Sequence, residues 1–200
     1  MLAQIASLYG ALGNNGLMAY HLAPDHVTRL DALEQVLETA YHDLIENRHV
    51  FHKQSEDELS INIVGKLKSA GIEASHDTQT GGHCDIHVRG ADHFLWIGEA
   101  KVHSTYKWLE DGFHQLSTRY ATGAYGQDSG ELLIYCTGAR GVDVLETWRD
   151  KLVELYPEVA VVEDKIRERL WFRTTHTGVS TGLPFNTRHR LLPLHFAPLK

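Results

Sequence analysis

The chain has 200 residues, of which 42% are hydrophobic and 22% are charged, and its formal net charge is −7 with the 14 histidines counted as neutral. This composition is ordinary for a globular protein and excludes a disordered or fibrous chain, and the length suits a single domain. The charge is unevenly distributed, since residues 165–200 carry seven basic residues and one acidic residue, whereas residues 1–164 carry 12 basic and 25 acidic residues.

Membrane insertion and cysteine chemistry are not indicated by the sequence. No stretch approaches the roughly 18 apolar residues of a spanning helix, and the N-terminus lacks the basic start of a secretory signal. We therefore expect a soluble, cytoplasmic protein with no membrane partner. The two cysteines, Cys84 and Cys136, lie far apart without a CxxC pair, so neither a disulfide framework nor a cysteine zinc site is predicted.

Two helices are predicted in the first part of the chain. Residues 27–47 place leucine, valine and alanine at spacings of three and four, which is typical of an amphipathic helix. A second helix begins at Ser55, because Ser55 and Glu58 form an S-x-x-E capping box, and it ends at Gly71.

The period of the pattern then changes from 3.6 to 2, so residues 81–90 and 93–103 are predicted to form two strands of a hairpin. Alternation places Asp85 on the face opposite the apolar positions of its strand, and it places Glu99 and Lys101 on one face of the next strand. If the turn holds three or five residues, the register pairs positions whose numbers sum to 184, and Asp85 faces Glu99.

The rest of the chain alternates between helices and strands. The patterns predict a helix over 105–121, a buried strand over 131–138, a helix over 142–156 and a strand over 169–176. No element is assigned to residues 188–198. The order of elements predicts an α/β or α+β fold with a mixed central sheet flanked by helices.

The two carboxylates and the ammonium group of the hairpin indicate metal chemistry. Close carboxylates repel each other unless a cation neutralises them or one of them is protonated. Oxygen ligands suit Mg²⁺ or Mn²⁺, and such an ion can lower the pKa of a bound water and bind a phosphate oxygen, while a nearby lysine orients the water. These properties are those needed to hydrolyse a phosphodiester bond.

The motif Asp85-x13-Glu99-Ala100-Lys101 resembles the PD-(D/E)XK nuclease superfamily, which includes restriction endonucleases and RecB-type nucleases, although Cys84 replaces the proline. The resemblance implies a restriction-endonuclease-like fold with Asp85 and Glu99 as ligands of Mg²⁺ (or Mn²⁺) and Lys101 as the group that positions water. It divides the chain into an N-terminal helical segment (1–50) packed on the core, a nuclease core (51–164) and a basic C-terminal strand or tail (165–200) of the same domain.

The same resemblance implies two further site residues. Glu58 matches the acid of the preceding helix that completes the metal site in many members, but its capping-box position gives it an equally good structural role. Gln115 matches a glutamine on the helix after the lysine in RecB-like members, and Arg119 lies on the same i, i+4 row of that helix.

The basic residues and histidines suggest where nucleic acid binds. Arg169, Arg173, Arg188 and Arg190 are interleaved with aromatic residues in the C-terminal segment, a mixture that can neutralise phosphate and stack on bases. The alternative is a strand packed on the core whose arginines pair with the acidic body. His83 and His87 flank Asp85, so they are candidates for phosphate contact, with a His-x-Asp-x-His zinc site as the less favoured alternative.

The expected activity is metal-dependent cleavage of DNA, with RNA also possible as the substrate, and a homodimer or a partner subunit would help to form the nucleic-acid channel. Restriction, antiphage defence and repair follow from the resemblance alone. A catalytically inactive nucleic-acid-binding or assembly module of the same fold, and an RNA-cleaving toxin, are the alternatives.

Overall fold

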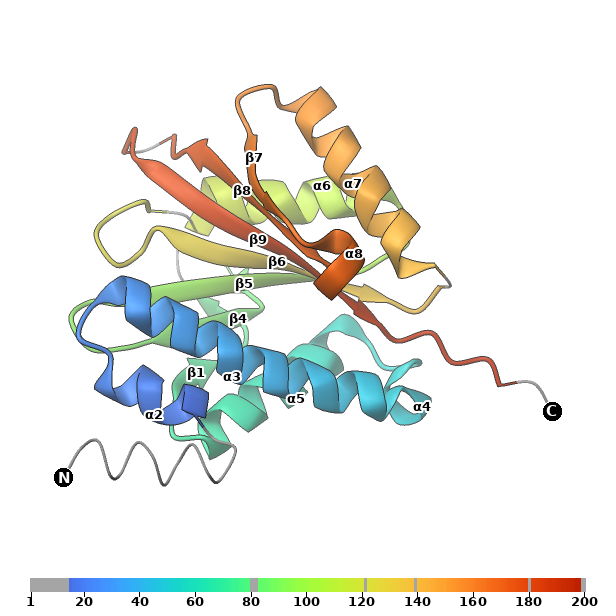
Figure 1. Cartoon of the computed structure of the whole chain (residues 1–200), viewed down its shortest axis with the longest axis horizontal. Coiled ribbons are helices and arrows are strands. Elements are labelled where there is room, and N and C mark those ends of the chain that lie inside the picture. The colour runs from blue at the N-terminus through green and yellow to red at the C-terminus, as the bar shows by residue number, and fades with distance from the viewer. Residues whose placement is uncertain (1–14, 80–82, 121, 139, 180, 199–200) are drawn as a thin grey trace.

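A computed structural model of the protein describes residues 15–79, 83–120, 122–138, 140–179 and 181–198. The described chain forms a mixed α/β fold in which a seven-stranded mixed sheet is flanked by helices on both faces (Figure 1). The strand order is β1-β4-β5-β6-β9-β8-β7, and β2 and β3 form a separate two-stranded sheet. In the described part of the chain, no helix is long and apolar enough to cross a membrane.

The helices are α2 (Asn15–Leu22), α3 (His26–Glu46), α4 (Arg48–Phe51), α5 (Glu56–Ser69), α6 (Tyr106–His114), the π-helix η1 (Gln115–Tyr120), α7 (Gly141–Leu155) and α8 (Ile166–Arg169). The strands are β1 (Glu73–Ser75), β2 (Thr78–Gln79), β3 (His83–Cys84), β4 (Ile86–Arg89), β5 (Leu95–Val102), β6 (Ser129–Cys136), β7 (Ala160–Asp164), β8 (Trp171–Thr177) and β9 (Pro184–Pro193). Strands β5, β6 and β9 are parallel neighbours, and the other pairs of the large sheet are antiparallel.

Two hydrophobic cores lie on opposite faces of the sheet. Helices α2, α3 and α5 cover one face, where Trp96 and Ala100 of β5 are buried. Helices α6 and α7 cover the other face, where Leu95 and Ile97 of the same strand are buried. Alternation along β5 therefore directs the odd-numbered positions, including Glu99, toward the face covered by α6.

The predicted hairpin is confirmed together with its register. Ile86 pairs with Gly98 and Val88 pairs with Trp96, so paired positions sum to 184. The first strand is not continuous, however, because the chain bends at Asp85 between β3 and β4. As a result Cys84 packs in the core under α6, whereas Ile86 packs in the opposite core.

Of the segment left without a predicted element, 188–198, residues 188–193 belong to β9, a strand in the interior of the sheet between β6 and β8 (Figure 1). Residues of β9 alternate between the two cores, with Phe185 and Leu191 on the α7 face and Leu192 on the α3 face. Arg188 and Arg190 have the parity of Leu192, so they point toward α3. Because these two residues are charged, they interrupt the run of apolar residues by which a buried strand is recognised in a sequence.

Candidate metal and phosphate site

Asp85 lies at the bend that precedes β4, directly beside the strand that carries Glu99. Its side chain is half-buried, and its Oδ2 accepts a hydrogen bond of 2.7 Å from the backbone N–H of Ala100. Burial raises the pKa of Asp85, while the hydrogen bond from Ala100 and the charge of Lys101 oppose that rise. The bond holds one carboxylate oxygen against β5 and fixes the orientation of the other.

Glu99 and Lys101 project from β5 beneath α6 and form a buried ion pair. Lys101 Nζ donates to Glu99 Oε1 at 2.6 Å, and the two residues are only 4% and 2% exposed, respectively. Glu99 Oε2 is buried and has no hydrogen-bond partner among the residues that the structure describes. Burial, followed by the neighbouring charge of Asp85, raises the pKa of Glu99 to about 7. The described part of the chain thus leaves one carboxylate oxygen of the site unsatisfied.

The stem of Lys101 runs closely past α6. A Cβ on Gly112 would lie 2.8 Å from Lys101 Cγ, so a larger residue at this helix position would force the lysine side chain or the helix to shift. The ring of Trp108 lies 5.0 Å from Lys101 Nζ, within the range of a cation–π contact. Burial alone would lower the pKa of Lys101, but the charges of Glu99, Glu56 and Asp85 outweigh it and the pKa is raised. The ammonium group is therefore charged and precisely oriented.

The acid of α5 that lies beside Lys101 is Glu56, and the structure does not bring Glu58 to the site. Glu58 is exposed, and its Oε2 accepts hydrogen bonds from the backbone N–H and the hydroxyl of Ser55 at 2.7 and 2.9 Å. Glu56 Oε1 lies 3.5 Å from Lys101 Nζ, and its Oε2 accepts a bond of 2.7 Å from the backbone of Val102. The capping box located the start of the helix correctly, but a different residue of its first turn faces the site.

A histidine missed in the sequence also lies at the site. One potential ligand atom from each of Asp57, His76 and Asp85 falls within 4.8 Å of the others. Asp57 follows Glu56 in α5, and His76 follows the last residue of β1. The carboxylate oxygens of Asp57 and Asp85, together with this histidine, form a donor set that fits a divalent cation.

The two histidines predicted to flank Asp85 do not gather around it. His83 is exposed, and its Nδ1 is 2.7 Å from Asp77 Oδ1. His87 is buried in β4 opposite Ile97, and burial lowers its pKa. The bend at Asp85 breaks the alternation that would have aligned all three side chains, which removes the basis of the His-x-Asp-x-His zinc alternative.

Gln115 and Arg119 lie on the solvent side of α6 and η1. Together with Trp108 they line an open groove of about 410 Å³. Gln115 is the first residue of the π-helix, a rare element that often marks functional positions. Trp108 lines this groove, and its ring also lies 5.0 Å from Lys101 Nζ, so this side chain is shared by the groove and the candidate site.

Two arginines of the C-terminal segment pair with α3 in a manner that leaves little charge for nucleic acid. Arg173 donates to both carboxylate oxygens of Glu34 at 3.1 and 2.9 Å. Arg190, which is buried, donates to both oxygens of Glu38 at 3.0 and 2.9 Å. Glu34 and Glu38 are one helical turn apart, so α3 presents both carboxylates to the sheet.

Arg188 is buried between the same helix and β6. Its Nε donates to Glu131 Oε2 at 2.6 Å, and the hydroxyl of Tyr41 donates to the other oxygen of Glu131 at 2.7 Å. This geometry agrees with the alternative stated from the sequence, a strand whose arginines pair with the acidic body. Arg169, at the end of α8, is exposed and remains a candidate for phosphate contact.

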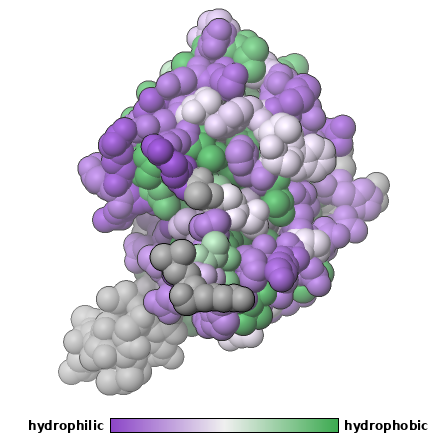
Figure 2. Space-filling model, turned by 90° about the vertical axis from the view of Figure 1, so that its right-hand side faces the viewer, coloured by the Kyte–Doolittle hydropathy of each residue, from purple (hydrophilic) through white to green (hydrophobic). Residues whose placement is uncertain are grey.

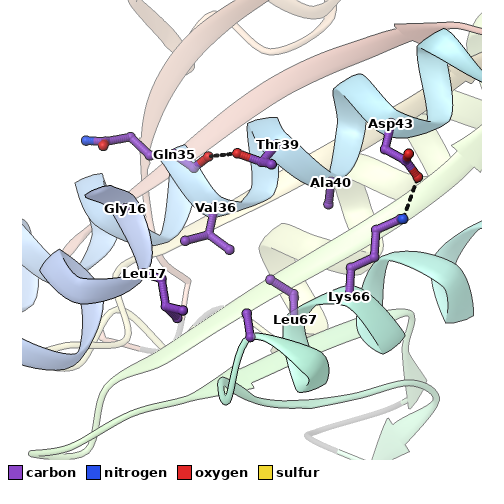
Figure 3. Close-up of a pocket in the computed structure, with 10 residues that line it drawn as sticks. Gly16, Leu17, Gln35, Val36, Thr39, Ala40, Asp43, Lys66 and Leu67 are labelled. Atoms are coloured by element: carbon purple, nitrogen blue, oxygen red, sulfur yellow. Dashed lines mark hydrogen bonds and ion pairs between the residues drawn. The ribbon is translucent and has the colours of Figure 1, made fainter. Parts of the chain in front are cut away.

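A separate pocket of about 340 Å³ lies between α2, α3 and α5 (Figure 3). Leu17, Val36 and Leu67 form its apolar part, and an ion pair between Asp43 and Lys66 closes one side. None of the predicted site residues lines this pocket.

The C-terminal end of β5 and helix α4 lie on the side of the molecule that faces the viewer in Figure 2, where the surface is largely hydrophilic.

In comparisons with protein families, curated proteins and solved structures, none matched this chain.

Proposed function

We propose that the chain is a metal-dependent nuclease that hydrolyses phosphodiester bonds in DNA, with Asp85, Glu99 and Lys101 as its catalytic residues. The observation that carries this proposal is the buried, unpartnered Oε2 of Glu99 beside Asp85, with a charged lysine 2.6 Å from the other oxygen. Burying a carboxylate without satisfying it costs stability. A binding module has no use for such an arrangement, whereas a metal site needs it.

Each residue has a task that follows from its contacts. Asp85 and Glu99 would hold the cation, because each has an oxygen that is not committed to a hydrogen bond with the backbone or with Lys101. The bound ion would lower the pKa of a water molecule and neutralise charge on the phosphate. Lys101 has three donors, of which Glu99 takes one, so it can also bind the attacking water or a phosphate oxygen.

Glu56 acts on Lys101 rather than on the substrate. Its carboxylate lies 3.5 Å from Nζ while its other oxygen is bound to the backbone of Val102, so it holds the ammonium group in place. The nucleic acid would approach along the groove of α6 and η1, where Trp108 can stack on a base and Arg119 can contact phosphate. Gln115 would contact the substrate from the same groove.

The test is incubation of the purified protein with plasmid DNA, single-stranded DNA and RNA in Mg²⁺, Mn²⁺ or EDTA. We expect cleavage of DNA with either metal, none with EDTA, and products that end in 5′-phosphate and 3′-hydroxyl groups. Metal-dependent cleavage of RNA without cleavage of either DNA would support the RNA-cleaving toxin alternative, which uses the same site, and metal-independent cleavage would contradict the proposed mechanism. Binding without cleavage under every condition would support the inactive module.

A further inference from the structure

Asp85 belongs to a second cluster besides its pair with Glu99. Potential ligand atoms of Asp57, His76 and Asp85 lie within 4.8 Å of one another. These residues come from three separate segments, namely the first turn of α5, the residue after β1 and the bend before β4. Their convergence depends on the packing of α5 and β1 against the hairpin.

One ring nitrogen of His76 has no hydrogen-bond partner within residues 15–79, 83–120 and the other described ranges. Its Nε2 is buried and unpartnered, and it lies 3.7 Å from Asp57 Oδ1, which is beyond hydrogen-bonding distance. Buried polar atoms are nearly always satisfied in proteins, and an exception calls for an explanation. A second unsatisfied atom, Oε2 of Glu99, lies on the strand that faces Asp85 across the β4–β5 register.

The spacing suits a cation after a small adjustment. Ligands bound at about 2.0–2.2 Å from one ion lie roughly 3–3.5 Å from each other, so the three ligand atoms would need to approach by about 1 Å. The side chain of Asp57 is 75% exposed and can rotate to do so, whereas the side chain of His76 is only 18% exposed and has less room to move. The histidine would thus be the fixed ligand and the aspartate the adjustable one.

We infer that Asp57, His76 and Asp85 form a binding site for a divalent transition metal, of which Mn²⁺ is the representative, and that His76 is a direct ligand. An imidazole nitrogen favours transition metals, whereas Mg²⁺ and Ca²⁺ prefer a shell made only of oxygen. The site therefore selects Mn²⁺ over Mg²⁺. This inference rests on the proposed function only in that Asp85 serves both the catalytic pair and this cluster.

The test uses Mn²⁺ alone, without nucleic acid. Pulsed electron paramagnetic resonance of the bound ion is expected to show coupling to an imidazole nitrogen, and a Mn²⁺ titration is expected to show that excess Mg²⁺ displaces the ion poorly. His76→Ala should abolish the nitrogen coupling and weaken Mn²⁺ binding more than about 10-fold. Asp57→Asn, at an exposed position where folding is not at risk, should weaken binding while retaining the coupling.

His83→Ala is the matched control, since His83 also lies beside an aspartate, at 2.7 Å from Asp77, but outside the cluster. It should retain both the coupling and the affinity. Nitrogen coupling that persists in His76→Ala, or equal competition by Mg²⁺, would overturn the inference. If the protein cleaves DNA with Mg²⁺ but bound Mn²⁺ shows no coupling to a nitrogen of His76, the proposed function holds and this inference fails. If the coupling is observed but no metal supports cleavage, the metal site holds and the proposed function fails.

Discussion

Replacing Glu99 by glutamine is expected to stabilise the metal-free protein above neutral pH while it removes activity. Burial and the charge of Asp85 raise the pKa of Glu99 to about 7 from an ordinary value of 4.5. The folded state therefore binds more protons than the unfolded state between these two values, so this residue's contribution to stability falls as the pH rises from 4.5 to 7. Above pH 7 the full penalty of the buried charge is present.

The size of the penalty follows from the shift. A difference of roughly 2.5 pKa units corresponds to about 3 kcal/mol. Glutamine carries no charge and can still accept a hydrogen bond from Lys101 through its amide oxygen, although the lysine then loses an ionic partner. We therefore expect Glu99→Gln to gain about 1–3 kcal/mol over the wild type at pH 8, and little or nothing at pH 5.

Urea unfolding in EDTA at pH 5 and pH 8 measures this difference. The matched control is Glu131→Gln, because Glu131 is also a buried glutamate of the central sheet but is bound by Arg188 and Tyr41. That variant should lose about 3 kcal/mol or more at both pH values, since it leaves Arg188 with a weakened set of partners. The difference in unfolding free energy between Glu99→Gln and the wild type should be larger at pH 8 than at pH 5. An equal or smaller difference at pH 8 would refute the reasoning.

Three further predictions concern the surroundings of the site and the core. Gly112→Ala should lower the rate of cleavage at least about 10-fold, because its Cβ would lie 2.8 Å from Lys101 Cγ. Gly65→Ala, whose Cβ would meet nothing within 4 Å, should not lower it. Cleavage rates and urea midpoints of the two variants test this difference. Equal rates for the two variants would contradict the packing argument. Trp108→Ala should weaken binding of single-stranded DNA by about 1–3 kcal/mol, measured by fluorescence anisotropy, and unchanged affinity would exclude stacking at this ring. His189 is buried, and its pKa is lowered to about 3. Its contribution to stability is therefore complete above pH 6.5 and declines as the pH falls. The urea midpoint of His189→Gln should change less between pH 7 and pH 4 than that of the wild type, and an equal change would disprove the prediction.

The hairpin that carries Asp85, Glu99 and Lys101 could be predicted because the signals for it are local in the sequence. Alternation within one strand fixed the parity of Glu99 and Lys101, and the length of the turn fixed the register that brings Asp85 beside Glu99. The start of α5 was equally clear, since the capping box of Ser55 and Glu58 forms as predicted. These features depend on residues that are close in the sequence.

The parts that were missed depend on contacts between distant segments. Glu56 and His76 reach the site only through the packing of α5 and β1 against the hairpin, and no spacing in the sequence encodes that packing. The interior strand β9 was missed because Arg188 and Arg190 occupy positions where a buried strand normally carries apolar residues. Their partners Glu34 and Glu38 lie about 150 residues earlier in the chain.

In the folded protein, most of the arginines predicted to bind nucleic acid are paired with acidic residues of the same chain. Three arginines of the basic C-terminal segment, Arg173, Arg188 and Arg190, form ion pairs with Glu34 and Glu38 of α3 across the interface between that helix and the sheet. Of the four arginines predicted there to bind nucleic acid, only Arg169 lies exposed. Contact with DNA is therefore expected to centre on the groove of α6 and η1 beside Lys101.

The most direct test of the central claim is the rate of DNA cleavage by the wild type, Asp85→Asn, Glu99→Gln and Lys101→Met under identical metal concentrations, with circular dichroism to verify folding. The account predicts metal-dependent cleavage by the wild type and a fall of about 100-fold or more in each folded variant. Glu58→Gln, which alters only the helix cap, should retain most of the activity. Cleavage at the wild-type rate by folded Asp85→Asn and Glu99→Gln would contradict the account.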